Sequence, residues 1–173
     1  AFNELRIRLT PASILTLPRD GEKFTLDVDA SEYQLGACLL QEQADGKLAP
    51  CGYYYRTLNP AEWNYSALEK ECLAVVWAVL FLRPYLERVH FVIRSGQVAL
   101  RWLLDLKNPS GRLERWGLRL EEFNFEILYR PGIKNYLADG CSRLRSHGID
   151  KTLFDDSVPS FEVNMLLDTD SEA

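Results

Sequence analysis

Apolar and polar residues alternate along the first third of the chain with the period of β-strands. Residues 24–30 and 34–41 follow this pattern, and a third strand is expected over residues 48–56. The dipeptide Asp45-Gly46 lies between the second and third segments and is typical of a tight hairpin turn. These features predict an antiparallel meander of three strands.

A long helix is predicted after the meander. Ser66 and Glu69 have the spacing of a capping box, and Pro84 ends the helix near Leu82. Glu71 lies on a stripe of small residues, which allow a helix to approach a sheet closely, so we expect its carboxylate near the sheet. The broad apolar stripe contains Leu68, Cys72, Val75 and Val79, and the small stripe contains Ala67, Glu71, Ala74 and Ala78.

The remaining pattern predicts two more strands and further helices. The expected elements are a short amphipathic helix within residues 2–16, a strand at 90–94, helices at 97–106 and 112–123, a strand at 125–130 and a short helix at 135–144. On helix 112–123, the inward side chains are Leu113, Trp116, Leu120 and Phe123. A right-handed crossover through the long helix makes the later strands parallel to the first. The expected fold is a three-layer α/β architecture, with a five-stranded mixed sheet and helices on both faces.

Composition fits a single globular domain. The 173 residues are 47% hydrophobic, enough for one buried core, and no run of 18 apolar residues is present. The N-terminal residues lack the apolar segment of a signal peptide. We therefore expect no membrane association and an intracellular protein, in the cytoplasm, the nucleus or both. The four cysteines have no CxxC spacing and are expected to be reduced thiols.

The net charge of −5 is unevenly distributed. From Asp150 onward, seven acidic residues face one lysine, so this segment carries −6 and residues 1–149 carry +1. A near-neutral body binds phosphates only through a local basic patch. Residues 146–173 are expected to form an acidic, flexible linker.

Three acidic residues stand in distinctive local sequences: Asp29 at the end of a strand, and Glu71 and Asp139 on helices. These segments resemble the RNase H domain of gypsy-class LTR retrotransposon reverse transcriptases, over residues 1–145. The motifs that carry the resemblance are Asp29–Ala37, Tyr55–Glu62, Asn64–Ala78, Ser110–Trp116, Tyr129–Gly132 and Leu137–Arg143.

The resemblance implies a domain division and an activity. Residues 1–20 would be a helix and linker from the polymerase portion of the same polyprotein, and residues 21–145 the RNase H-like domain. Members of this family cleave the RNA strand of RNA/DNA hybrids with four carboxylates that hold two Mg²⁺ ions, for which Mn²⁺ can substitute. By this resemblance Asp29 would bridge both ions, Glu71 would bind one of them, and Asp139 would close the other side of the site.

The fourth carboxylate is missing. Where the family has Thr-Asp-His, this chain has Ser95-Gly96-Gln97, and Gly96 has no side chain to bind a metal. Asp27 lies on the same strand face as Asp29, about 7 Å away, but it would enter the pocket from the wrong side. We therefore expect hydrolysis to be crippled or absent.

Basic residues mark two candidate nucleic-acid contacts. Arg112, Arg115 and Arg119 share one helical face, which either follows the phosphates of a duplex or is a solvated face paired with Glu114 and Glu122. A second group, near the helix of Asp139, contains Arg130, Lys134 and Asn135. Among the four tryptophans, only Trp63 is expected to be exposed.

Several functions remain open on this evidence. One is a working RNase H with three carboxylates. The preferred alternative is a degenerate RNase H-like domain retained within a reverse transcriptase, or a host-captured, non-catalytic module that binds nucleic acid or a protein. Recent decay of an inactive genomic copy is a third alternative.

Overall fold

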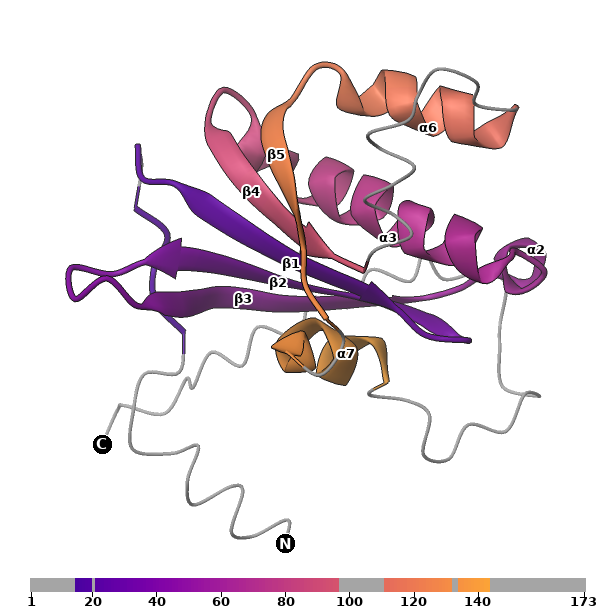
Figure 1. The fold of residues 1–173 in the computed structure, drawn as a ribbon, viewed down its shortest axis with the longest axis horizontal. Coiled ribbons are helices and arrows are strands. Elements are labelled where there is room, and N and C mark those ends of the chain that lie inside the picture. Colours follow the sequence, from indigo (N-terminus) through magenta and orange to yellow (C-terminus); the bar gives the residue numbers. More distant parts are fainter. Residues whose placement is uncertain (1–14, 20, 97–110, 132–133, 144–173) are drawn as a thin grey trace, which may run out of the picture.

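The computed structural model describes residues 15–19, 21–96, 111–131 and 134–143, which contain a five-stranded mixed sheet (Figure 1). The strands are β1 (Phe24–Ala30), β2 (Gln34–Glu42), β3 (Leu48–Thr57), β4 (His90–Ser95) and β5 (Asn124–Tyr129). Their order across the sheet is β3-β2-β1-β4-β5. The first three strands pair antiparallel, and β1–β4 and β4–β5 pair parallel. The predicted five-stranded mixed sheet, with its later strands parallel to the first, is confirmed.

Helices lie on both faces of this sheet. They are α2 (Pro60–Trp63), α3 (Ala67–Phe81), α4 (Arg83–Leu86), α6 (Arg112–Leu120) and α7 (Tyr136–Ser142). The long α3 packs on β1, β2 and β4 and is covered by α6, whereas α7 packs on β2, β1 and β3 (Figure 1). None of the described helices is long and apolar enough to cross a membrane. The helices predicted within 2–16 and 97–106, and the acidic segment 146–173, lie outside the described residues.

The long helix begins where its capping box predicts. Ser66 Oγ accepts a hydrogen bond from the Glu69 backbone N–H, and the Glu69 carboxylate accepts one from the Ser66 N–H. Cys72, Val75 and Val79 are fully buried in the main core, together with apolar side chains of β1 and β4. The predicted apolar stripe therefore faces the sheet.

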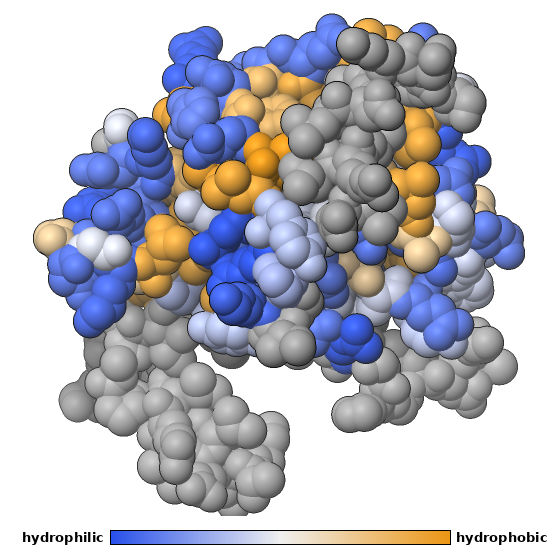
Figure 2. All heavy atoms as spheres, viewed as in Figure 1, coloured by the Kyte–Doolittle hydropathy of each residue, from blue (hydrophilic) through white to orange (hydrophobic). Residues whose placement is uncertain are grey.

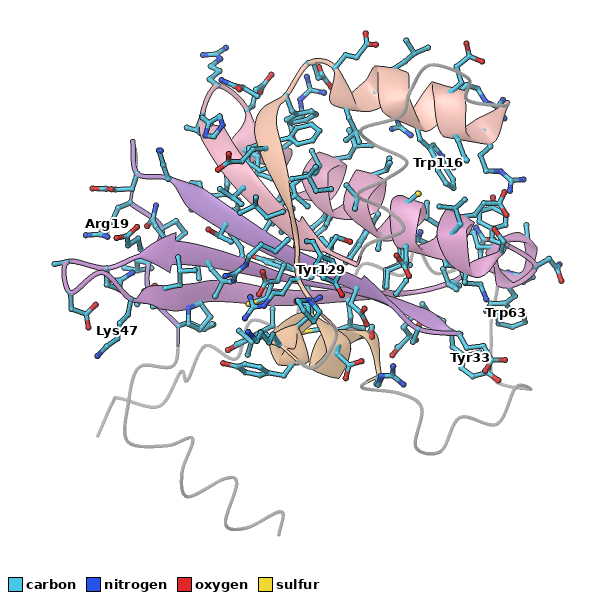
Figure 3. All side chains as sticks on the ribbon, viewed as in Figure 1. Arg19, Tyr33, Lys47, Trp63, Trp116 and Tyr129 are labelled. Carbon is cyan, nitrogen blue, oxygen red and sulfur yellow. The ribbon has the colours of Figure 1, made fainter. Side chains whose placement is uncertain are left out.

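The inward face of α6 is also as predicted. Leu120 and, beyond the end of the helix, Phe123 are buried in the main core, and Leu113 and Trp116 pack against it. Trp116 is labelled in Figure 3. The four cysteines, Cys38, Cys51, Cys72 and Cys141, are free thiols.

The exposure predicted for Trp63 is wrong. This side chain is partly buried and packs against a second apolar cluster that contains Leu35 and Leu58 (Figure 3). The short α2 explains the difference. Trp63 is the last residue of this single turn, which Asn59 caps, and the turn sets the direction of the Trp63 side chain. A one-turn helix of this kind gives no periodic signal in the sequence.

Candidate active site

A glycine allows α7 to lie directly on the sheet beside Asp29. Gly36 of β2 pairs with Asp29 of β1. A Cβ atom at position 36 would overlap the Ala138 carbonyl oxygen and the Ser142 backbone nitrogen, both in α7. Any side chain larger than hydrogen would therefore push the helix off the sheet.

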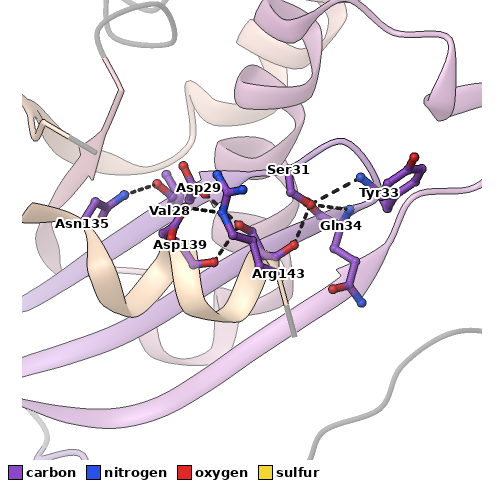
Figure 4. Close-up of polar contacts among 9 residues, drawn as sticks. Val28, Asp29, Ser31, Tyr33, Gln34, Asn135, Asp139 and Arg143 are labelled. Carbon is purple, nitrogen blue, oxygen red and sulfur yellow. Dashed lines mark hydrogen bonds and ion pairs between the residues drawn. The ribbon is translucent and has the colours of Figure 1, made fainter. Parts of the chain in front are cut away.

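Three hydrogen bonds then tie both ends of α7 to β1 and the turn that follows it (Figure 4). Asn135 Nδ2 donates to the Val28 carbonyl oxygen at 2.9 Å, before the first turn of the helix. At the other end, Ser142 Oγ donates to Asp29 Oδ2 at 2.8 Å, and Ser31 Oγ donates to the Ser142 carbonyl oxygen at 2.6 Å. The position of α7 relative to Asp29 is therefore fixed at two points.

This arrangement couples Asp29 electrostatically to Asp139 on α7. Burial raises the pKa of Asp29, the Ser142 hydrogen bond partly opposes this rise, and the charge of Asp139 adds to it. Arg143, one turn further along, donates from Nε to Asp139 Oδ1 at 2.6 Å (Figure 4). Asp29 and Asp139 thus form an acidic pair with one arginine at its edge.

Glu71 lies against position 96. A Cβ atom on Gly96 would be 2.9 Å from Glu71 Oε2 and 3.4 Å from its carboxyl carbon. Gly96 is not among the glycines with positive φ, so its backbone conformation does not require glycine. An aspartate here would place its carboxyl group beside that of Glu71 after a small movement of the flexible Glu71 side chain.

The sheet register relates these two groups to each other. β1 and β4 pair in parallel up to Asp27 opposite Arg94, and two further residues along each chain lead to Asp29 and Gly96. The structure therefore brings Asp29 and Asp139 together at the C-terminal end of β1 and sets Glu71 against Gly96, just after the C-terminal end of the neighbouring strand β4. In the described part of the chain, no three His, Cys, Asp or Glu side chains form a group that could hold a metal ion.

Asp27 is not available to replace the missing carboxylate. Its side chain is fully buried and accepts hydrogen bonds from two arginines. Arg94 Nη2 lies 2.9 Å and Arg130 Nη1 lies 2.6 Å from Asp27 Oδ2. The Asp27 oxygens are taken up by these two guanidinium groups, which gives no support to the alternative of Asp27 as a substitute ligand.

The basic residues of α6 differ in their surroundings. Arg112 donates to Glu69 Oε1 at 2.7 Å and lies over the Tyr65 ring, 3.9 Å from its centroid. Arg115 and Arg119 are exposed. Glu122, which the solvated-face alternative pairs with these arginines, accepts a hydrogen bond from Arg83 at 2.8 Å. The structure thus leaves two of the three arginines open to a ligand.

The second basic group is similarly divided. Lys134 is exposed, whereas Arg130 is paired with Asp27. Asn135 is only 2% exposed and uses its amide to hold Val28, so it positions α7 and does not face the surface.

Sequence reasoning missed Gly36, Ser142, Arg94 and Arg143 as parts of this site. Three of them stand within segments that already resembled the family, so a closer reading of those segments would have singled them out. No local pattern marks Arg94 as a partner of Asp27, because this contact depends on the register of two parallel strands.

Comparison with known proteins agrees with this fold and its motifs. Residues 19–123 match the family model described as the RNase H-like domain found in reverse transcriptase. The chain is 45% identical over 145 residues to the retrovirus-related Pol polyprotein from transposon 297 of Drosophila melanogaster, which covers 84% of this chain and 13% of that protein. The chain thus spans a small part of the curated relative.

Solved structures show the same fold at low sequence identity. The foamy viral protease-reverse transcriptase in complex with RNA/DNA hybrid has a TM-score of 0.55 at 18% identity, covering 77% of this chain and 19% of that one. RNase H1 from Halobacterium salinarum has a TM-score of 0.51 at 17% identity, and the match covers 69% of this chain and 93% of that one. With its motifs and its matched region, the chain belongs to the family of RNase H-like domains found in reverse transcriptases, here of the retrotransposon Pol type.

Proposed function

We propose that this domain binds RNA/DNA hybrids and hydrolyses them slowly or not at all. The observation that carries this proposal is the closeness of position 96 to the Glu71 carboxylate. A side chain at position 96 would lie beside that carboxylate, and Gly96 supplies no carboxylate there.

The chemistry of the family explains why one carboxylate matters. Two metal ions activate a water molecule and stabilise the leaving oxygen, and hard cations such as Mg²⁺ require several oxygen ligands in fixed positions. Asp29, Asp139 and Glu71 supply suitable oxygens, but they are divided between an acidic pair and a separate glutamate. The residues present therefore do not complete a two-ion centre.

The expected loss of rate is large. Each tenfold loss of rate corresponds to an increase of about 1.4 kcal/mol in the activation barrier. If one poorly held metal ion raises this barrier by about 4 kcal/mol, cleavage slows by roughly 10³-fold. Binding does not require the missing carboxylate, because phosphate contacts come from cationic side chains.

The exposed Arg115 and Arg119 on α6, and Lys134 before α7, support nucleic-acid binding. The complex of the foamy viral enzyme with a hybrid adds support from a protein of the same fold. The polymerase portion of a Pol polyprotein is the proposed protein partner, and the cell interior the proposed location.

The test uses one short RNA/DNA hybrid in two assays. Fluorescence anisotropy is expected to show salt-dependent binding, because phosphate contacts release counterions. Gel analysis with Mg²⁺ and with Mn²⁺ is expected to show little or no cleavage of the RNA strand. Turnover at a rate ordinary for an RNase H would contradict the proposal, and so would the absence of binding at low salt.

A further inference from the structure

The buried ion cluster around Asp27 carries more positive than negative charge. One carboxylate is shared by two positively charged guanidinium groups. Asp27 is fully buried, and its carboxylate forms ion pairs with both of these arginines. The cluster therefore holds a net charge of about +1 at the sheet surface.

The two arginines keep N–H donors that the described residues do not use. Arg94 contacts Asp27 through Nε and Nη2, and Arg130 contacts it through Nη1. Within the described part of the chain, Arg94 Nη1 and Arg130 Nε and Nη2 make no hydrogen bond. The side chains remain 20% and 19% exposed. Asp27 thus fixes the guanidinium groups of Arg94 and Arg130 and leaves some of their N–H donors accessible.

The cluster lies next to the acidic pair on the same face of the sheet. Asp27 precedes Asp29 by two residues on β1, so both side chains point to the α7 face, about 7 Å apart along the strand. Arg94 precedes Gly96 by two residues in the same way. α7 packs mainly on β2, β1 and β3, so among the described helices it does not extend over the β4–β5 side of this face. In the view of Figure 2, hydrophilic residues lie near the centre of the molecule.

We propose that Arg94 and Arg130 together bind a backbone phosphate of a nucleic-acid strand, beside the phosphate that faces the carboxylates. The proposal rests on the nucleic-acid binding proposed above and names the residues that carry it. Guanidinium groups bind phosphate through paired N–H donors, and groups already fixed by Asp27 lose little freedom on binding. A phosphate would also neutralise the surplus charge.

The competing explanation is purely structural, since Asp27 also ties the ends of β4 and β5 to β1. Single substitutions separate the two. Arg94→Gln leaves Arg130 on Asp27, and Arg130→Gln leaves the paired contact from Arg94, so each variant keeps a partner for the buried carboxylate. Arg88→Gln is the matched control, because Arg88 is exposed and precedes the opposite end of β4.

The first measurement is hybrid affinity across a series of salt concentrations for the parent and the three variants. The logarithmic salt slope is expected to fall by about 1 in Arg94→Gln and in Arg130→Gln, and to stay at the parent value in Arg88→Gln. Thermal unfolding confirms that each variant is folded. Slopes equal to the parent value in both folded variants would overturn the proposal.

The second measurement does not depend on nucleic-acid binding. Inorganic phosphate is titrated into the parent while NMR follows the side-chain Nε–H signals of the arginines. The signals of Arg94 and Arg130 are expected to shift and saturate, whereas that of Arg88 does not. If the parent binds no hybrid, the proposed function fails, and the phosphate titration alone then tests the phosphate site. Arg94 and Arg130 signals that do not move on addition of phosphate would reject that site.

Discussion

Ser142 Oγ donates a hydrogen bond to Asp29 Oδ2 at 2.8 Å and so joins the last turn of α7 to the end of β1. Ser142 is fully buried, and its carbonyl oxygen accepts from Ser31. The acidic pair of Asp29 and Asp139 therefore depends on one hydroxyl group that holds the helix and orients the strand carboxylate.

Substitution Ser142→Ala removes this bond and leaves a partly buried carboxylate oxygen without its donor. We expect a loss of about 1–3 kcal/mol in the free energy of unfolding, measured by urea denaturation. The pKa of Asp29, followed by NMR, is expected to rise, because the hydrogen bond lowers it in the parent. An unchanged pKa would show that the hydroxyl does not act on this carboxylate.

Two glycines near α7 give opposite predictions. Gly36→Ala places a methyl group against the helix backbone, so we expect a loss of about 1–3 kcal/mol in stability. Gly140→Ala, within α7, adds a Cβ that meets nothing within 4 Å and should stabilise by about 0.5–1 kcal/mol. Urea denaturation of both variants tests the close packing of α7. A neutral Gly36→Ala variant would mean that the helix does not lie so near the sheet.

The raised pKa of Asp29 predicts how its substitution depends on pH. Burial makes the charged carboxylate unfavourable in the folded protein, so the stability that the protonated form contributes is lost as pH rises through the folded pKa. Asp29→Asn avoids this loss and can still accept from Ser142. We expect the variant to be more stable than the parent at about pH 7, with the difference shrinking towards the usual aspartate pKa of about 3.9.

Denaturation curves of parent and variant at both ends of that range provide the check. A stability difference that does not change with pH would argue against a buried, titrating Asp29.

Much of the fold could be predicted because its signals are local. The capping box of Ser66 and Glu69 marks the start of α3, and Gly46, with a φ of 78°, closes the hairpin that the Asp45-Gly46 pair predicts. The segment Tyr55–Glu62, part of the family resemblance, proves structural. Its Arg56 forms two hydrogen bonds with Glu62, at 2.7 and 3.1 Å.

The site was harder to predict because its contacts join distant segments. The pairing of Asp27 with Arg94 and Arg130 depends on the register of three strands, which no local pattern encodes. The importance of Gly36 follows from the closeness of a helix about 100 residues later in the chain. The inference that Gly96 replaces a carboxylate rested on the family resemblance. The closeness of the Glu71 carboxylate to position 96 now supports that inference from the structure.

The most direct test is RNA-strand cleavage of an RNA/DNA hybrid by the parent, Gly96→Asp and the matched uncharged variant Gly96→Asn, each with Mg²⁺ and with Mn²⁺. The parent and Gly96→Asn are expected to cleave slowly or not at all, and Gly96→Asp to cleave at least about 10³-fold faster than the parent, a barrier difference of about 4 kcal/mol. Equal and substantial cleavage by all three would contradict the claim that position 96 limits this domain.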